Sequence, residues 1–509
     1  MSNNTYVSLD RTTNQALGIG QYAIDFLAGR LGTPAPVVLA KVEQFHLDSI
    51  ACGVSALACG TNAPSVLRRE ALEYAVSGAS QGVPLFGSRV PVMPEKAVAA
   101  NSSAVREWDS NGTNFGFNPR RGDICGEFGH NDFYPVAIAA AQLAQCNGRQ
   151  TLLAMVALDE IRGRLAEVFA LKNHKIDHVV HGAVASAAVY GAMLGATAEQ
   201  IESAIGMLVA HYVPFRAIRH GKQLSDSKGA SAAISAEVAV LSMKRAMQGF
   251  VGPADIFRNP EAIFCLFEPP STSHTSPFEL HLAASGDDFA IMGMHFKLGL
   301  YEHQSAGAIQ GLIDLLTKNP QLLTSADDIK SIRITIYEPA FSIIGDPAKR
   351  DPQTRQSADH SMVYIIATLL RKAIEHGRAG WQVLMLEPAD YDATALQHPL
   401  TRALVDRIEF RHGGPDYDVR YPDGIPTTLE IEHGAAGWFS SGLVMYPEGH
   451  ARNDSGNLAG LLAHKFRTLA SLGVRDSDAL YRRFTGLAQK SADEIRMLYD
   501  FQILGLVDA

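Results

Sequence analysis

The first half of the chain has the apolar spacing of consecutive amphipathic helices. Apolar residues recur every three or four positions in the segments 35–58, 136–143, 152–171, 184–194 and 230–247. Turn-forming sequences such as Cys146-Asn147-Gly148 and Gly252-Pro253 separate these segments. Many of them are rich in alanine and glycine, which allows helices to pack closely. No strong alternating pattern precedes about residue 285, so this half is expected to be helical.

Strand-like alternation begins in the second half. Apolar and polar residues alternate in the segments 332–337, 407–411, 417–421 and 427–431. The last two flank Pro422-Asp423-Gly424, which favours a hairpin at this point. Helical spacing at 306–316 and 362–373 lies between the strands and predicts a smaller α+β unit. From residue 457 the pattern is helical again.

These patterns predict a mainly α protein: a large all-helical domain built from both chain ends, with a smaller α+β lid domain inserted into it. The expected boundaries are 1–275 for the first part of the helical domain, 276–454 for the lid and 455–509 for the helical completion. The Pro-, Ser- and Thr-rich stretch 267–276 marks the first crossing. A cleft between two such domains is a natural place for a small ligand.

Composition and charge narrow the classes of function. Of 509 residues, 47% are hydrophobic and 19% charged, which is typical of a folded protein. The net charge of -9 disfavours nucleic acid as a partner, because phosphates require a basic surface. No apolar run is long enough to span a bilayer, and the polar residues 1–11 do not read as a secretory signal. We therefore expect a cytoplasmic protein without a membrane partner.

The five cysteines form no Cys-x-x-Cys pair. An odd count in a long chain favours reduced thiols over a disulfide scaffold, and the spacing disfavours a structural zinc or iron–sulfur site. We expect neither a metal nor another cofactor.

Four polar segments are candidates for chemistry, each with a structural alternative. Residues 106–113 and 129–132 carry Asp, Asn, Thr and His at expected helix ends, where Asn131 or Asp132 would also serve as a helix cap. The basic stretch 215–228 is either a solvated turn or an anion site, with Lys228 near a helix start. The absence of a glycine-rich phosphate loop favours a carboxylate as the anion.

Two further segments contain histidine and lysine. Lys297 follows His295-Phe296 on an expected strand, where an edge-strand lysine is the structural alternative. His174 and His178 have the i, i+4 spacing of two metal ligands on a helix, but no third ligand is evident, so a polar helix start is preferred.

In this order, the segments resemble the MmgE/PrpD family over nearly the whole chain. The resemblance rests on Leu47-Asp48-Ser49-Ile50-Ala51-Cys52-Gly53, Asp177-His178-Val179, Arg219-His220, Lys228, Phe296-Lys297, Asp359-His360-Ser361-Met362-Val363-Tyr364 and Tyr446-Pro447-Glu448-Gly449-His450-Ala451-Arg452. It implies a helical domain with an inserted α+β lid, and a homodimer. It also places the family's site residues on Asp109, Thr113, His130, His178, Lys228 and Lys297, with a looser match at Tyr337.

The chain departs from the family pattern near this site. Gly112 stands where the family usually has a second Asp before the Thr, Asn131 replaces a Pro, and the loop 114–129 is longer than usual.

The resemblance implies a metal-free lyase acting on a small tricarboxylic acid, converting 2-methylcitrate to 2-methyl-cis-aconitate. In this hypothesis Lys228 and Lys297 stabilise the charge that develops on the substrate, with Arg216 or Arg219 as help. Arg216, Arg219 and His220 also bind substrate. His130 transfers the proton, with Asp109 orienting it or acting as the base, and Thr113, His178 and Tyr337 bind substrate. The alternatives are decarboxylation of cis-aconitate, another carboxylate lyase or epimerase reaction of the family, and a non-catalytic carboxylate-binding protein. A nucleotide-dependent enzyme is the least favoured.

Overall fold

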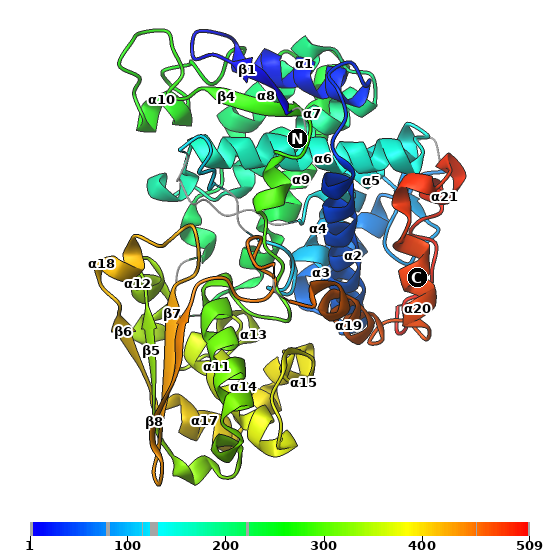
Figure 1. The fold of residues 1–509 in the computed structure, drawn as a ribbon. Coiled ribbons are helices and arrows are strands. Elements are labelled where there is room, and N and C mark those ends of the chain that lie inside the picture. Colours follow the sequence, from blue (N-terminus) through cyan, green and yellow to red (C-terminus); the bar gives the residue numbers. More distant parts are fainter. Residues whose placement is uncertain are drawn as a thin grey trace. The chain divides into compact units, whose positions relative to one another are not determined.

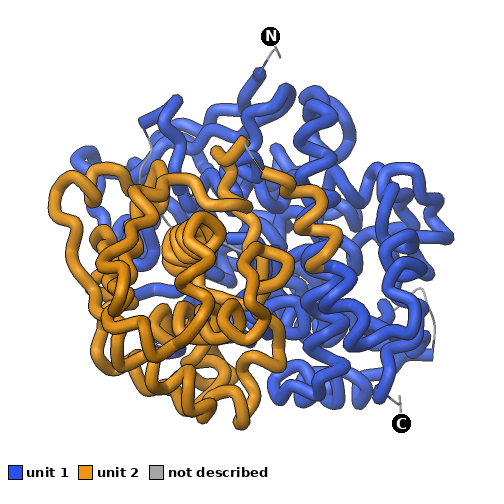
Figure 2. The backbone as a smooth tube through the Cα atoms, turned by 60° about the horizontal axis from the view of Figure 1, so that its bottom comes forward, with its two compact units in different colours: residues 1–218, 229–294, 466–509 blue, residues 219–228, 295–465 orange. Residues whose placement is uncertain are grey.

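The computed structural model describes residues 4–77, 82–113, 116–122, 131–219, 223–454 and 456–506. The chain divides into two compact units (Figure 2). Unit 1 comprises 1–218, 229–294 and 466–509, and unit 2 comprises 219–228 and 295–465. Helices dominate the described residues, which confirms the mainly α class (Figure 1).

Unit 1 is a bundle of packed helices with a largely apolar interior. Its helices and the two that it shares with unit 2 are α1 (Gln15–Leu27), α2 (Pro36–Ala58), α3 (Asn62–Glu73), α4 (Pro94–Arg106), α5 (Tyr134–Leu143), α6 (Gly148–Val168), α7 (Val179–Met193), α8 (Ala198–His211), α9 (Asp226–Met247), α10 (Ile263–Phe267), α19 (Leu458–Ala470), α20 (Ser477–Phe484) and α21 (Ala492–Arg496). Helix α6 packs against α7 and α2, and α4 packs against α2 and α3.

Local sequence explains where the central helices begin. Helix α6 starts with a capping box, in which Asn147 and Gln150 each bond to the other's backbone N–H. Helix α2 starts with Pro36 in its first turn, where the missing N–H has no cost. Every residue from Phe45 to Leu57 is buried, so α2 is a core helix. Within the described ranges, no single helix combines the length and apolar character needed to cross a bilayer. The pair α2 and α3, bent by 88° at their junction, meets that test only when joined.

Unit 1 also contains short strands that the sequence pattern missed. Strand β1 (Thr5–Leu9) pairs antiparallel with β4 (Leu280–Ser285), and β2 (Val83–Pro84) pairs with β3 (Pro91–Val92). Strand β1 alternates but exposes much of both faces, so it carries little of the apolar signal of a half-buried strand.

Unit 2 is built on a four-stranded mixed sheet in the order β6-β5-β7-β8. Strand β5 (Ile329–Ile336) pairs parallel with β6 (Ile408–His412) and antiparallel with β7 (Thr427–His433), which pairs antiparallel with β8 (Gly437–Val444). Helix α11 (Ala306–Lys318) packs on β7 and β8, and α14 (Met362–His376) packs against α11 and α17 (Pro399–Val405). The remaining helices of four residues or more are α12 (Ala340–Ile344), α13 (Arg355–Ala358), α15 (Trp381–Leu384), α16 (Ala393–Leu396) and α18 (Pro415–Asp418).

The alternation predicted in β5 is confirmed. Ile332, Ile334 and Ile336 are fully buried. Arg333 points to the other face, where it pairs with Glu409 on β6 at 2.8 Å and with Glu430 on β7 at 3.2 Å. Apolar side chains on one face and cross-strand ion pairs on the other are what a half-buried sheet requires.

The predicted strand 417–421 and its hairpin are wrong. Residues Pro415–Asp418 form the short helix α18 instead. Gly414 precedes it with φ +73°, and Pro415 occupies the first helical position, so the local backbone favours a helical turn. The hairpin joins β7 and β8, which pair up to His433 and Gly437.

Two buried histidines in unit 1 predict acid sensitivity. Burial lowers the pKa of His46 on α2 to about 3, and burial lowers that of His181 on α7 to about 4, against an ordinary value of 6.5. Below pH 6.5 both histidines become protonated in the unfolded chain, but in the folded protein they stay neutral until the pH approaches their lowered pKa values. The free energy of unfolding should therefore fall as the pH falls from 6.5, by about 2 kcal/mol per ring at pH 5.

Denaturant titrations at pH 7.5 and pH 5 measure this loss. His46→Phe keeps an aromatic ring against Tyr134 and Phe484 but cannot titrate, so it should remove the share of the loss that is due to His46. His376→Gln, at an exposed position, is the control and should leave the loss unchanged. An unchanged pH dependence in His46→Phe would contradict the assignment.

Candidate functional site

In unit 1, Asp109 lies at one end of a buried chain of alternating charges. Arg106, the last residue of α4, places Nη1 3.2 Å from Asp109 Oδ1 and Nε 3.5 Å from Asp132 Oδ2. Arg162 on α6 continues the chain, with Nη1 3.7 Å from Asp132 Oδ1 and Nε donating to Asp159 Oδ1 at 2.8 Å. All five side chains are buried, and the pairing of acidic with basic groups offsets the cost of burying them.

The far end of this chain is closed by a tyrosine. Tyr134 donates its hydroxyl hydrogen to Asp159 Oδ2 at 2.5 Å. Burial raises the pKa of Asp159 although Arg162 and Tyr134 oppose the shift. The guanidinium groups thus fix the orientation of three carboxylates, of which Asp109 and Asp132 lie on loops and Asp159 lies on α6.

The expectation that Asn131 or Asp132 caps α5 is wrong. The residue before α5 is Phe133, which makes no side-chain cap. Asp132 faces Arg106 and Arg162 instead, and Asn131 Nδ2 donates to Phe45 O and Ser49 Oγ, each at 2.7 Å. Both polar side chains tie the loop before α5 to the helices around it.

The loop from Asp109 to Thr113 is packed against α2. A Cβ atom on Gly112 would lie 2.2 Å from Phe45 Cε1 and 2.9 Å from Met294 Cε, so a side chain cannot be accommodated there. This packing explains why the chain lacks an Asp at position 112. Thr113 is fully buried, and its Oγ1 has no hydrogen-bond partner among the described residues.

His178 is buried at the start of α7, with Nδ1 3.6 Å from Asp177 Oδ1. It does not share a helix with His174, because a 3₁₀ turn ends at His174 and Lys175 then adopts φ +60°. His174 Nε2 lies 2.8 Å from Glu268 Oε1. The helical spacing of the two histidines therefore does not give a pair of ligands on one helix face.

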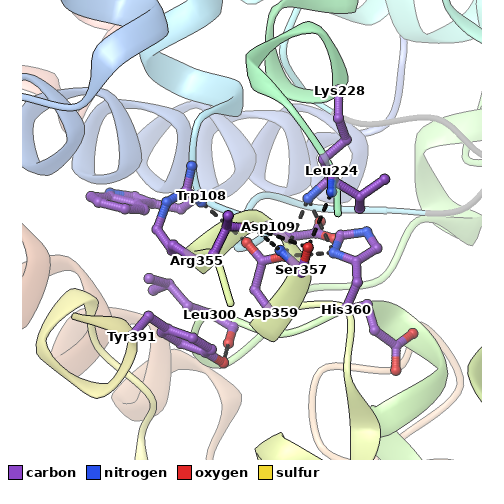
Figure 3. Close-up of polar contacts among 12 residues, drawn as sticks. Trp108, Asp109, Leu224, Lys228, Leu300, Arg355, Ser357, Asp359, His360 and Tyr391 are labelled. Atoms are coloured by element: carbon purple, nitrogen blue, oxygen red, sulfur yellow. Dashed lines mark hydrogen bonds and ion pairs between the residues drawn. The ribbon is translucent and has the colours of Figure 1, made fainter. Parts of the chain in front are cut away.

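In unit 2, Lys228 belongs to a buried cluster with Asp359 and His360 (Figure 3). Its Nζ lies 3.3 Å from Asp359 Oδ1 and 3.1 Å from His360 Nδ1, while His360 Nδ1 lies 2.5 Å from Asp359 Oδ1. Arg355 adds a contact to Asp359 Oδ2 at 3.1 Å. Burial pushes the pKa of Asp359 upward, but the Lys228 ammonium and the His360 ring outweigh burial, and the pKa lies below its ordinary value.

Lys297 is buried in an irregular segment, not on the expected strand. The edge-strand alternative is therefore also wrong. Phe296 N donates to Gly449 O at 2.8 Å, and Gly299 adopts φ +145°. With this φ the backbone does not continue as a regular β-strand. Lys465 Nζ donates to Lys297 O at 2.8 Å.

Three histidines of unit 2 have stacked rings: His295 and His303, which lie on either side of Lys297 in the sequence, and the distant His450. The His295 ring lies 3.9 Å from that of His450 and 5.1 Å from that of His303. The backbone N–H of Ala451 donates to His295 Nδ1 at 2.9 Å, and that of Arg452 donates to His450 Nδ1 at 3.1 Å. An Nδ1 that accepts a hydrogen bond leaves the proton on Nε2, so both rings are fixed as Nε2–H tautomers.

The backbone connects the Lys297 segment to the Lys228 cluster. Glu302 N donates to Asp359 O at 2.8 Å. Tyr337, the last predicted residue of unit 2, is fully buried, with its ring stacked 4.6 Å from Tyr421. Its hydroxyl has no hydrogen-bond partner in the described part of the chain. Burial, then Tyr421 and Glu302, raise the pKa of Tyr337 well above its ordinary value.

Two of the remaining predicted residues, Arg216 and Arg219, lie on one 3₁₀ turn (Arg216–Arg219). Arg216 is part of unit 1, Arg219 belongs to unit 2, and both are partly exposed. His130 and His220 lie outside the described residues. Asp109 and Thr113 thus share one loop of unit 1, while Lys228, Lys297 and Tyr337 lie in segments of unit 2 that hydrogen bonds and charge interactions connect.

The sequence pattern missed three titratable groups, of which Asp359 is buried and His360 and Lys41 are half-buried. Asp359 and His360 contributed to the family resemblance but were not singled out as site residues. Lys41 on α2 lies 5.6 Å from the centroid of the Phe45 ring, and burial lowers its pKa to about 8. Lys41 is the single lysine of α2, but Glu43, His46 and Asp48 lie on the same helix, so the sequence carries no signal that distinguishes it.

Comparison with known proteins identifies the family. The MmgE/PrpD N-terminal domain matches residues 28–272, and the MmgE/PrpD C-terminal domain matches residues 301–483. The chain therefore belongs to the MmgE/PrpD family.

Curated relatives carry one activity name. The 2-methylcitrate dehydratase of Escherichia coli (strain K12) is 24% identical over 428 residues, which is 80% of each chain. The probable 2-methylcitrate dehydratase of Saccharomyces cerevisiae is 24% identical over 445 residues, covering 83% of this chain and 79% of the relative. The 2-methylcitrate dehydratase of Cupriavidus necator is 25% identical over 331 residues, 63% of each chain.

Proposed function

We propose that this protein is a hydro-lyase that removes water from a small tricarboxylic acid, converting 2-methylcitrate to 2-methyl-cis-aconitate. The observation that carries the proposal is the match of both halves of the chain to one family, together with relatives named 2-methylcitrate dehydratase that align over about four-fifths of it. Buried lysines and a buried carboxylate at the positions expected from the family support it.

The chemistry has two demands. A proton must leave a carbon next to a carboxylate, which is a very weak acid, and a tertiary hydroxyl must depart as water. Ammonium groups against the substrate carboxylate stabilise the negative charge that develops there, worth about 3 kcal/mol per preorganised donor. We assign this role to Lys228 and Lys297, with Arg216 and Arg219 contributing charge to substrate binding.

We assign the proton transfer to either Asp109 or His130. Arg106 holds the Asp109 carboxylate in place, and an imidazole titrates near the pH of the cell. The pH dependence of kcat in variants separates the two: the group that transfers the proton causes a loss of activity on the acid side, and this loss should disappear when that group is replaced. Thr113, His178 and Tyr337 supply hydrogen bonds to the substrate.

Product analysis tests the proposal. Protein treated with a chelator and freed of it is incubated with 2-methylcitrate, citrate or cis-aconitate, and the products are identified by NMR. We expect 2-methyl-cis-aconitate from 2-methylcitrate, at a rate that chelation does not change. Carbon dioxide and itaconate from cis-aconitate would establish a decarboxylase instead. Activity that disappears on chelation and returns with a divalent cation would contradict the metal-free mechanism.

A further inference from the structure

Asn111 carries a buried amide that stands out because the described residues offer it no hydrogen-bond partner. Its side chain is fully buried, and neither Oδ1 nor Nδ2 has a hydrogen-bond partner among the residues that the structure describes. Leaving a buried donor and a buried acceptor unpaired costs folding free energy. Thr113 Oγ1, two residues along the same loop, is in the same condition. The ligand-free protein thus presents unused hydrogen-bonding groups beside Asp109.

The other buried asparagines of unit 1 form hydrogen bonds through their side-chain amides. Asn101 accepts from Phe86 N at 2.9 Å and donates to Pro84 O at 3.3 Å. Asn118 accepts from Arg120 N at 3.2 Å, and Asn131 donates to Phe45 O at 2.7 Å. Each of them holds a local backbone segment in place. Asn111 makes no such bond to the part of the chain that the structure describes, so that part of the fold does not use its amide.

The loop that carries Asn111 is rigidly placed on both sides. Asp109 is held by Arg106 at 3.2 Å, and the backbone at Gly112 is in close contact with the Phe45 ring. The amide is therefore preorganised, which is the condition under which a hydrogen-bonding group contributes most to ligand recognition.

A side-chain amide places a donor group, the two N–H bonds of Nδ2, and an acceptor, Oδ1, in a single plane. A carboxylate alone uses only the donor and leaves Oδ1 facing an anion. A hydroxyl next to a carboxylate uses both, because the carboxylate oxygen accepts from Nδ2 while the hydroxyl donates to Oδ1. We propose that Asn111 is a specificity-determining residue that binds the hydroxyl and adjacent carboxylate of a 2-hydroxy polycarboxylic acid, with Thr113 contributing a further hydrogen bond. The proposal rests on the proposed function for the class of substrate.

Binding measurements test this without turnover. The probes are citrate and propane-1,2,3-tricarboxylate, which lacks the hydroxyl, each titrated calorimetrically. The wild-type protein should bind citrate at least about tenfold more tightly than the deoxy acid, since a hydrogen bond of ordinary strength gives that ratio. In Asn111→Leu the two affinities should lie within about threefold of each other. The thermal midpoint of this ligand-free variant should equal or exceed that of the wild type, because the change removes unpaired polar atoms.

Asn101→Leu is the matched control. It removes the bond to Phe86 N, so it should lower the thermal midpoint while keeping the preference for citrate. Asn111→Ala replaces the Leu variant if the latter does not fold. An undiminished citrate preference in either Asn111 variant would overturn the proposal, as would a wild type that binds neither acid. If the wild type prefers citrate, the Asn111 variants lose that preference and 2-methylcitrate yields no alkene, the inference stands and the proposed function fails.

Discussion

Lys228→Met is expected to lower kcat for dehydration of 2-methylcitrate by about 10²- to 10³-fold, the usual effect of removing one preorganised donor to a developing charge. KM should rise as well, because the ammonium also attracts the substrate carboxylates. Asp359 keeps Arg355 and His360 as partners, yet it loses a buried cation at 3.3 Å. Breaking such a pair costs roughly 3 kcal/mol of folding free energy, so unfolding should be measured alongside kinetics.

Lys318→Met is the matched control, because Lys318 is exposed at the end of α11 in the same unit. It should leave both kcat and KM unchanged. A Lys228→Met variant that unfolds at a lower temperature but keeps wild-type kcat where it is folded would show that Lys228 serves only to neutralise Asp359.

Asp109→Asn is expected to reduce kcat by about 10²- to 10⁴-fold, the range by which positioned acid–base groups contribute. The substitution preserves shape and removes the charge. Arg106 retains Asp132 at 3.5 Å, so the buried guanidinium is not left unpaired and the fold should survive. Steady-state kinetics and a thermal midpoint on the same sample measure the two effects.

Asp132→Asn separates chemistry from structure. Asp132 faces both Arg106 and Arg162, so its loss should destabilise the buried charge chain more than Asp109→Asn does. Its effect on kcat should be the smaller of the two. If Asp132→Asn reduced kcat as much as Asp109→Asn, the role of Asp109 would be to maintain the chain rather than to act on the substrate.

Helix positions could be predicted where a long apolar period and clear turn residues coincide. The segment 35–58 corresponds to α2, and 306–316 corresponds to α11, each within a few residues. The alternation at 332–337 likewise corresponds to β5. The strand prediction at 417–421 failed because five alternating residues are a weaker signal than the Gly414-Pro415 pair at the start of α18.

The sequence allowed individual site residues to be predicted, but not the contacts between them. Lys228 and Asp109 were identified by resemblance, but their partners could not be. Lys228 and Asp359 are 131 residues apart, and no local spacing connects them. Arg106 lies three residues before Asp109 in the sequence, so that pair could have been proposed. The contact of Arg106 with Asp132 depends on how α4 and the loop before α5 pack. Such contacts follow from tertiary packing and not from periodicity.

The central claim is that buried ammonium groups enable this protein to expel water from a tricarboxylate. Its most direct test is the rate of alkene formation from 2-methylcitrate, followed by NMR, for the wild type and for a variant with both Lys228 and Lys297 changed to Met. We expect the wild type to form 2-methyl-cis-aconitate and the double variant to be slower by at least about 10⁴-fold. Alkene formation at an equal rate by the two proteins, or none by the wild type, would contradict the account.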